Sequence, residues 1–389
     1  MKILYIVSRP LEINTSASIR NQATIKGLIE LGHDVKLITS NPDQNHSNYD
    51  LNYIPNLQDT YYIKLDGLQK HAKLIRKFRF LHPFKKIFQY MSNKLSLYDN
   101  LIDFTNHVDE LIIDDNTYDV IISSSDPKSS HLFVYKLFET KKIVNTPWIQ
   151  IWGDPFSADI SRKNRNMNKK VFDEEMKLFI YPYSIIYLSS LTLEEQKKTF
   201  PKYSSKMRYV PAPYLHQNIY DNKKINYSSI NLLYSGDYSS NIRNILPLYN
   251  AVTNTDHKLI ICGNSDKRLQ INDNIQIFPR LKFEEVKILE KNADVLVHLS
   301  NTNGNQIPGK IYQYAGTNKI ILFILDGKSD ELKTIYSKYN RFIFCNNETD
   351  SILQVFNKFE EYTRYVDGEP LEEFSPRNIS YEIIKNVKL

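Results

Sequence analysis

The stretch NGNQIPGKIYQYAGTNKIILFIL, residues 303–325, places a loop, a short helix and a buried strand in direct succession. Pro308 and Gly309 stand just ahead of a helix of about two turns, where the missing proline N–H is not needed and glycine permits a close backbone approach. Gly316 suits the end of that helix, and the apolar run 320–325 follows it. This order is typical of one unit of an α/β fold.

The same helix carries two polar side chains on one face. Lys310 falls in its first turn, and Gln313 lies three residues further on, beside Tyr314. A helix N-terminus with free N–H groups and a nearby lysine is a ready anion site. The alternative is a tight turn that caps a surface helix.

Outward from this stretch, short apolar runs with polar ends alternate with helical patterns such as 20–32, which ends at Gly32. Nearly continuous apolar runs are typical of parallel strands covered on both faces. Two successive arrays of this kind predict two doubly wound parallel sheets. The predicted strands are 2–8, 34–40, 119–125, 148–154 and 184–190, then 230–236, 257–264, 274–280, 294–300, 320–325 and 341–346.

The two arrays meet near YVPAPYL, residues 209–215, where two prolines interrupt the pattern. We therefore predict one domain over 1–212 and a second over 213–374, with the final helix 375–389 free to pack back on the first. A chain of 389 residues is long enough for two such cores.

Composition narrows the class of protein. Apolar residues make up 41% and charged residues 24%, and no run approaches about 18 consecutive apolar residues, so we expect a soluble protein without a spanning helix. The chain starts directly in a strand, without a signal peptide. Cys262 and Cys345 lie in apolar runs and read as small buried residues in a reducing cytosol. We expect a cytoplasmic location.

Polar residues follow the predicted strands at their carboxyl ends, where open α/β sheets bind ligands. With two such sheets, the expected site is the cleft between them. These residues are Ser8, Arg9, 123–127, Asp154, Pro155, 235–237, Gly263, Asn264 and 301–306.

Six segments together carry a family resemblance: 16–40 with its Arg-bearing helix, 119–137 with 148–156, the loop LLYSGDYSSNIRNI at 232–245, and LEKNADVLVHLS at 289–300 followed by 307–322. The chain resembles retaining nucleotide-sugar glycosyltransferases of the GT-B class, in which two Rossmann-like domains face each other across a cleft. Within that class it is most similar to glycosyltransferase family four, which includes bacterial capsule and O-antigen transferases. The resemblance covers nearly the whole chain and keeps the motif order.

The resemblance implies a hexosyltransferase that moves a sugar, with retention, from a nucleoside-diphosphate sugar to a glycan or lipid-linked acceptor in surface polysaccharide or glycoconjugate synthesis. It implies an acceptor-side first domain, a donor-binding second domain, UDP as the nucleotide and no other cofactor.

The chain departs from the family at several positions. Ser16-Ala17-Ser18 replaces a Gly-Gly loop, Gln313 and Asn305 replace glutamates, Asp237 replaces Arg, and Arg243 replaces Lys.

On the donor side, negative charge builds on the diphosphate as the glycosidic bond breaks, and cations placed there stabilise the transition state. Arg243 and Lys310 suit this role, and Arg binds phosphate in a bidentate manner. Gln313 is expected to reach the ribose hydroxyls. The alternatives are an ordinary surface Arg243 and a solvated Gln313. The predicted donor-binding residues are Gly236, Asp237, Arg243, Gly263, Arg280, Asn305, Pro308, Gly309, Lys310 and Gln313.

On the acceptor side, Asp154 closes a strand, where a carboxylate can stabilise an oxocarbenium-like centre or hold the acceptor hydroxyl. Capping of backbone N–H groups is its structural alternative. Arg20 follows the predicted loop 16–18 and approaches either phosphate or acceptor, unless it is a surface residue. The predicted acceptor-side set is Ser18, Arg20, Ser125, Asp126 and Asp154, and the predicted catalytic set is Asp154, Arg243 and Lys310.

We expect no metal, because the nine histidines lack ligand spacing, no D-x-D stands near a strand end, and Lys and Arg can take the electrostatic role of an ion.

Residues 68–94 are strongly basic with interleaved Phe and Tyr. This pattern suits an anionic membrane surface or a nucleic-acid backbone, or a hairpin packed on the first domain. We favour peripheral contact with the inner face of the plasma membrane, because the resembled family often glycosylates lipid-linked acceptors, and expect no nucleic acid.

Two other functions stay open on the sequence alone. One is a sugar-nucleotide epimerase or hydrolase with the same two domains. The other is a non-catalytic sugar-nucleotide-binding partner subunit, which the loss of carboxylates at Asn305 and Gln313 allows. A nicotinamide dehydrogenase is disfavoured, because no G-x-G-x-x-G follows the first strand.

Overall fold

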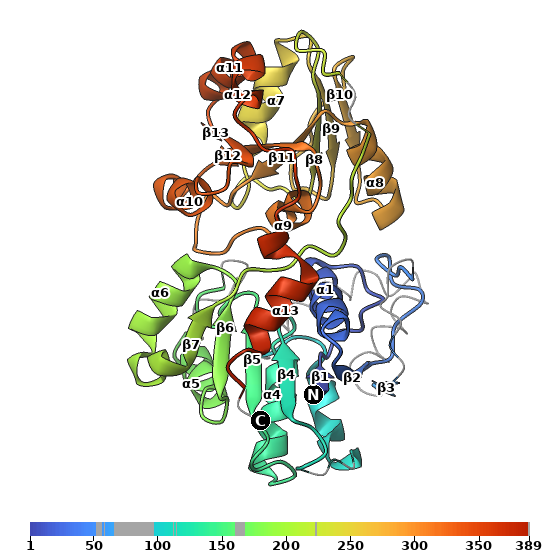
Figure 1. The fold of residues 1–389 in the computed structure, drawn as a ribbon, viewed down its shortest axis with the longest axis vertical. Coiled ribbons are helices and arrows are strands. Elements are labelled where there is room, and N and C mark those ends of the chain that lie inside the picture. Colours follow the sequence, from blue (N-terminus) through green and yellow to red (C-terminus); the bar gives the residue numbers. More distant parts are fainter. Residues whose placement is uncertain are drawn as a thin grey trace, which may run out of the picture. The chain divides into compact units, whose positions relative to one another are not determined.

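The computed structural model forms two compact units (Figure 1). Unit 1 comprises Met1–Pro211 and Pro376–Leu389, and unit 2 comprises Ala212–Ser375. These divisions fall within a residue of the positions that the proline-rich join and the final helix predict. The structure describes residues 1–51, 57, 59–65, 97–111, 113, 115–159, 168–221 and 224–387. The basic segment 68–94 lies outside the described residues.

Unit 1 is built on a seven-stranded sheet in the order β3-β2-β1-β4-β5-β6-β7, with every pair parallel. The order reverses beside β1, so the switch point of this doubly wound sheet lies between β1 and β4. The strands are β1 Lys2–Ile6, β2 Asp34–Ser40, β3 Asp59–Ile63, β4 Val120–Ser124, β5 Trp148–Trp152, β6 Ser184–Tyr187 and β7 Met207–Tyr209.

Both faces of this sheet are covered, as the continuous apolar runs predict. On one face Tyr5 packs with Ile25 and Ile383, and Figure 1 shows their helices α1 and α13 together there. On the other face Ile6 packs with Phe133. The helices of unit 1 are α1 Ser16–Glu30, α4 Ser129–Glu139, α5 Asn168–Leu178, α6 Ser190–Thr199 and α13 Pro376–Ile384, with 3₁₀ helices at Ile102–Glu110 and Pro201–Lys206.

The start of α1 corrects one prediction. The Thr15 Oγ1 atom accepts a hydrogen bond of 3.1 Å from the Ser18 N–H and caps the helix, which therefore begins at Ser16. Residues 16–18, expected as a loop, form the first turn. At the other end Gly32 has φ +81°, a left-handed conformation that favours glycine and terminates the helix.

Unit 2 repeats the same topology with six parallel strands, in the order β10-β9-β8-β11-β12-β13. Its switch point lies between β8 and β11, and α7 and α11 together cover one face. The strands are β8 Asn231–Ser235, β9 Lys258–Cys262, β10 Ile275–Phe278, β11 Val295–Leu299, β12 Ile320–Leu325 and β13 Phe342–Asn346. The helices are α7 Leu246–Thr253, α8 Phe283–Asn292, α9 Lys310–Ala315, α10 Ser329–Tyr336, α11 Thr349–Asn357 and α12 Phe359–Thr363, with a 3₁₀ helix at Glu372–Phe374.

The helix predicted after Pro308 is confirmed as α9, between the N-cap Gly309 and the C-cap Gly316. Gly309 has φ −62°, which any residue adopts, so its backbone conformation does not require glycine. Gly316 is different. A Cβ there would lie 2.6 Å from Cγ of Tyr214 and 2.9 Å from the His216 carbonyl oxygen, so only glycine admits this close approach.

The predicted strands are all present, most of them shortened by one to three residues. Two further strands escaped prediction: β3, whose exposed tyrosines break the apolar pattern, and β7, which has three residues. Both cysteines are buried and free. Among the described residues, none of the helices combines the length and apolar character needed to cross a membrane.

Gly27 tests the packing of α13 on α1. A Cβ at Gly27 would lie 1.9 Å from the Pro376 carbonyl oxygen and 2.4 Å from Oγ of Ser380. Alanine normally stabilises a helix interior by about 1 kcal/mol relative to glycine, but here the overlap dominates. We expect Gly27→Ala to lower the free energy of unfolding by about 1–3 kcal/mol in urea titrations. Gly368→Ala, whose Cβ would have its nearest neighbour at 3.9 Å, is the control, and an equal midpoint for both would contradict this packing.

Candidate functional site

In unit 2, polar groups at the carboxyl ends of three neighbouring strands are tied together through Asp237. Its Oδ1 atom accepts a hydrogen bond of 2.8 Å from the Asn264 N–H, and its Oδ2 atom lies 3.9 Å from Nη1 of Arg280. Asp237 follows β8, Asn264 follows β9 and Arg280 follows β10. The structure therefore brings together three loops that the sequence assigned to the donor.

Gly263 is required where two of these loops touch. A Cβ at Gly263 would lie 2.0 Å from the Gly236 carbonyl oxygen and 3.0 Å from the Asp237 nitrogen, and the Gly236 N–H donates to Cys262 at 2.9 Å. Any side chain at position 263 would push the loops apart. Gly263 thus permits a close backbone contact at this edge, whereas a Cβ at Gly236 would meet nothing closer than the Tyr234 hydroxyl at 3.5 Å.

The Arg243 side chain links the two loops on either side of the switch point of unit 2. Its Nε donates to Oδ1 of Asn301 at 2.9 Å, and its Nη1 donates to the Asp237 carbonyl at 2.9 Å. Its backbone N–H and C=O each pair with Ser239 at 3.1 Å, which closes a tight turn. The guanidinium is thus fixed between the loops that follow β8 and β11. These bonds count against an ordinary surface arginine, and the role of Arg243 at a phosphate stays a prediction.

Lys310 has an intrachain partner that sequence reasoning missed. Its Nζ lies 3.9 Å from Oε1 of Glu290 and 5.5 Å from the centre of the Tyr314 ring. Glu290 also accepts a hydrogen bond of 3.1 Å from the Tyr220 hydroxyl. Burial raises the pKa of Glu290, and the Lys310 charge opposes that rise. The ion pair is long, and the role of Lys310 at a phosphate stays a prediction.

Gln313 bonds to the backbone at the start of unit 2. Its Oε1 accepts from the Leu215 N–H at 3.0 Å, and its Nε2 donates to the Pro213 carbonyl at 3.1 Å. Both ends of the amide are therefore bonded to the backbone, and the ribose contact stays a prediction. Asn305 and Pro308 lie in the loop between β11 and α9, which Asn301 braces by donating to the Gln306 carbonyl at 3.0 Å.

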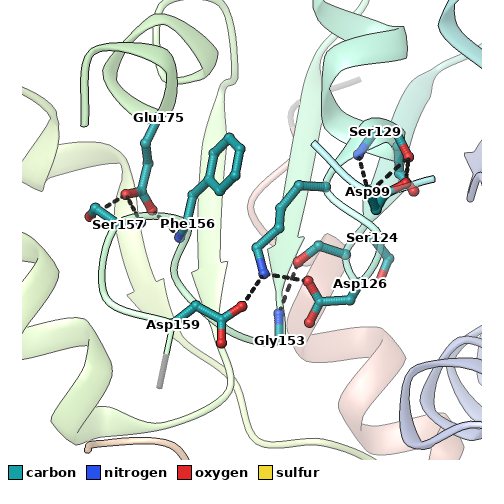
Figure 2. A network of polar contacts seen from close by, with 12 residues as sticks. Asp99, Ser124, Asp126, Ser129, Gly153, Phe156, Ser157, Asp159 and Glu175 are labelled. Carbon is teal, nitrogen blue, oxygen red and sulfur yellow. Dashed lines mark hydrogen bonds and ion pairs between the residues drawn. The ribbon is translucent and has the colours of Figure 1, made fainter. Parts of the chain in front are cut away.

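In unit 1, Lys128 lies at the centre of a charged cluster, and Figure 2 labels its partners Asp126 and Asp159. The Nζ atom donates to Oδ1 of Asp126 at 2.6 Å and to Oδ2 of Asp159 at 3.0 Å, and the Lys128 side chain is only 10% exposed. Burial alone would lower the pKa of Lys128, but Asp126, Asp159 and Asp154 outweigh it and raise the pKa. The ammonium therefore stays charged at working pH.

Asp154 stands two residues beyond β5, at the edge of this cluster. Burial raises the pKa of its carboxyl to about 7, and repulsion from Asp126 and Asp159 adds to the rise, while Lys128 and Arg20 oppose it. A carboxyl that titrates near neutrality is suited to proton transfer or to holding a hydroxyl.

Arg20, from the second turn of α1, is buried with 8% of its surface exposed, so the alternative of a surface arginine is wrong. Its Nη2 donates to Oγ of Ser124 at 3.3 Å and to the Ser125 carbonyl. A Cβ added to Gly153 would lie 3.0 Å from Nη1 of Arg20 and 3.4 Å from Oδ2 of Asp126. The structure thus brings Arg20, Ser125, Asp126 and Asp154 together, as predicted.

Ser18 is hydrogen-bonded within the cap of α1. Its N–H and hydroxyl both contact Oγ1 of Thr15, at 3.1 and 2.9 Å, in the cap of α1. The cap accounts for this serine, and its role toward an acceptor stays a prediction.

Several residues of the cluster were missed because their partners are remote in sequence. Besides Lys128 and Asp159, they include Asp99, which accepts from Oγ of Ser129 at 3.0 and 3.2 Å in the first turn of α4 (Figure 2). The segment SSSDPKSS did contain the signal, since Lys128 stands beside the predicted Asp126. Within the described ranges, no group of three His, Cys, Asp or Glu side chains is arranged to hold a metal.

Comparisons with known proteins agree on the architecture. No family model matches the sequence, and no curated protein does either. The catalytic domain of starch synthase IV from Arabidopsis thaliana, bound to ADP and acarbose, has a TM-score of 0.61 at 9% identity, covering 99% of this chain and 98% of its own. An alpha-glucosyltransferase in complex with UDP and a 13-mer DNA has a TM-score of 0.58 at 12% identity, covering 100% and 96%.

A glycosyltransferase from Rickettsia africae ESF-5 has a TM-score of 0.55 at 12% identity, covering 99% of each chain. At such identities the likeness concerns the fold. The expected GT-B fold, with two α/β units on parallel sheets, is confirmed.

Asp154→Asn tests the charge of the cluster. Because folding raises the pKa of Asp154 from 3.8 to about 7, its stabilising contribution is full below about pH 4 and is lost as pH rises through about 7. The variant should therefore gain stability relative to the parent between pH 4 and pH 7. The full rise corresponds to about 4 kcal/mol, and we expect about 1–3 kcal/mol because the neighbouring carboxyls share the proton. Urea unfolding at several pH values measures this.

Asp115→Asn is the control of opposite sign. Slight burial opposes the shift, but backbone N–H groups of Val144, Asn145 and Thr146 lower the pKa of Asp115. Its contribution is present above its unfolded pKa and is lost as pH falls, so this variant should lose stability relative to the parent as pH rises. Parallel stability curves for parent and Asp154→Asn would contradict the assignment of Asp154.

Proposed function

We propose that this chain is a glycosyltransferase that moves a sugar from a nucleoside-diphosphate sugar to a glycan or lipid-linked acceptor. The bond between the anomeric carbon and the diphosphate oxygen breaks, and a bond to the acceptor oxygen forms. The acceptor hydroxyl loses its proton, and the nucleoside diphosphate leaves. The observation that carries the proposal is Arg243, fixed at the switch point of unit 2 by Asn301 and the Asp237 carbonyl.

The donor site is assigned to the strand ends of unit 2. Arg243 and Arg280 follow two different strands there, and Lys310 follows a third, so a diphosphate would meet cations from three loops. Such charges stabilise the leaving group as the glycosidic bond breaks and can take the place of a metal ion. The ADP and UDP bound by two proteins of similar fold support a nucleoside diphosphate, and we take UDP as the first candidate.

The acceptor is assigned to the Asp154 cluster of unit 1. An ionised Asp154 either holds the acceptor hydroxyl or stabilises the positive charge on the anomeric carbon, and both roles need the carboxylate form. Retention of configuration, a role in bacterial surface polysaccharide or glycoconjugate synthesis, and peripheral membrane contact through 68–94 extend the proposal. Their support is the family resemblance and the basic composition of that segment.

The function is tested with the full-length chain and a panel of UDP-, GDP- and dTDP-sugars. A donor at about 100 times its dissociation constant adds roughly 2.7 kcal/mol to stability, so one nucleotide class should raise the melting temperature. With that donor, release of nucleoside diphosphate should require an added acceptor glycan. Release without acceptor would indicate a hydrolase, and binding without release or isomerisation would indicate a non-catalytic subunit.

Arg243→Ala tests the carrying observation. Because the lost cation acts on charge that develops in the transition state, turnover at saturating donor should fall about 10²–10³-fold. Arg364→Ala is the matched control, since that guanidinium is 69% exposed and forms its ion pair with Glu360, one helical turn away. Circular dichroism verifies folding of both variants. Equal turnover in the two would remove Arg243 from the mechanism.

A further inference from the structure

The loop from Gly153 to Asp159 carries Asp154 and is held in place at several points (Figure 2). The Gly153 N–H donates to Oγ of Ser125 at 3.2 Å. Glu175, on α5, accepts from the N–H groups of Phe156 and Ser157 at 2.7 and 2.8 Å. Lys128 holds the end of the loop through Asp159. The position of Asp154 is therefore set by anchors from two other segments, the loop before α4 and the helix α5.

Lys128 differs from the other anchors because it carries a charge into the cluster. It precedes α4, and its ammonium joins Asp126 on its own loop to Asp159 on the loop of Asp154. A buried ion pair is a weak source of stability, because removing both charges from water costs about as much as their attraction returns. The presence of a buried lysine here therefore calls for a role beyond stability.

The charges that face Asp154 show what that role is. Asp126 and Lys128 come from the loop before α4, Asp159 from the loop after β5, and Arg20 from α1. His131 on α4 stays neutral, because burial lowers its pKa and Lys128 and Arg20 lower it further. With every carboxylate ionised, three negative charges meet two positive ones. Arg20 donates to Ser124 and Ser125, so Lys128 is the cation that directly neutralises carboxylates in the cluster.

We infer that Lys128 is a positioning residue for sugar transfer, whose ammonium clamps Asp126 to Asp159 and thereby holds the loop and the ionised form of Asp154 ready for the acceptor. This inference rests on the proposed function, in which Asp154 must be ionised. Without Lys128, the two remaining like charges would drive Asp154 toward its protonated form. The same ammonium therefore fixes the conformation of the loop and sets the pH range in which Asp154 is ionised and transfer is active.

The test is the pH dependence of transfer in the full chain. In the parent, activity should fall as pH drops below about 7, where Asp154 becomes protonated. We call this fall in activity on the acid side the acid limb of the pH profile. In Lys128→Met the acid limb should move up by about one pH unit or more, because a nearby opposite charge typically lowers a carboxyl pKa by that amount. Turnover at pH 6 should then fall about tenfold relative to the parent, with the KM for the donor unchanged. Lys128→Arg keeps the charge and should leave the limb in place.

Asp159→Asn provides the opposite shift and does not depend on Lys128→Met folding. It removes a like charge from Asp154 and leaves Lys128 with one carboxylate fewer, so the acid limb should move to lower pH. Glu175→Gln is the matched control. It weakens another anchor of the same loop without changing the charges that face Asp154, so it should lower the melting temperature and leave the limb in place.

Two outcomes would overturn the inference: an unmoved limb in both Lys128→Met and Asp159→Asn, or an equal shift in Glu175→Gln. A readout independent of transfer is the ¹³C carboxyl titration of labelled aspartates, with the Asp154 signal identified by its loss in Asp154→Asn. If the parent transfers no sugar, the proposed function fails. The titration then still decides whether Lys128 sets the ionisation of Asp154, and an unchanged Asp154 titration in Lys128→Met overturns the inference.

Discussion

The strand order reverses beside the first strand of each sheet, and this constraint decides where polar side chains gather. Because all strands are parallel, their carboxyl ends meet at one edge, and at the switch point the connections leave in opposite directions. The interior of each sheet is mostly apolar on both faces, with buried polar exceptions such as Gln150 and His298. Polar groups at the strand ends are therefore the groups left to recognise a ligand, and in both units the candidate residues stand at this edge.

The two units present different charged groups at this edge of the sheet. In unit 2 the loops are held by Arg243 and by contacts to Asp237, which leaves cationic groups in place. In unit 1 the first turn of α4 already has an anion of its own, since Asp99 accepts from both the N–H and the hydroxyl of Ser129. A bound phosphate would compete with that carboxylate. This difference supports assigning the nucleotide to unit 2 and the acceptor to unit 1.

Much of the fold could be predicted because strands buried on both faces must be apolar throughout. Prediction failed where burial is incomplete, as in β3 and β7, or where a cap decides a boundary, as Thr15 does for α1. In the candidate site, residues at strand ends could be predicted from topology. Lys128 and Glu290 could not, because their roles depend on partners 31 residues away at Asp159 and 20 positions away at Lys310.

Gln313 shows how a departure from the family pattern can follow from local structure. Its amide accepts from the Leu215 N–H and donates to the Pro213 carbonyl, so it bonds to a donor and an acceptor of the same backbone segment. A glutamate, as the resembled family carries, has no donor when ionised and would leave the Pro213 carbonyl without this bond. The amide gives up charge-assisted bonding to a ligand in exchange for that backbone contact. One N–H and one lone pair of the Gln313 amide take no part in these two bonds. A ribose hydroxyl, which both accepts and donates a hydrogen bond, could use them.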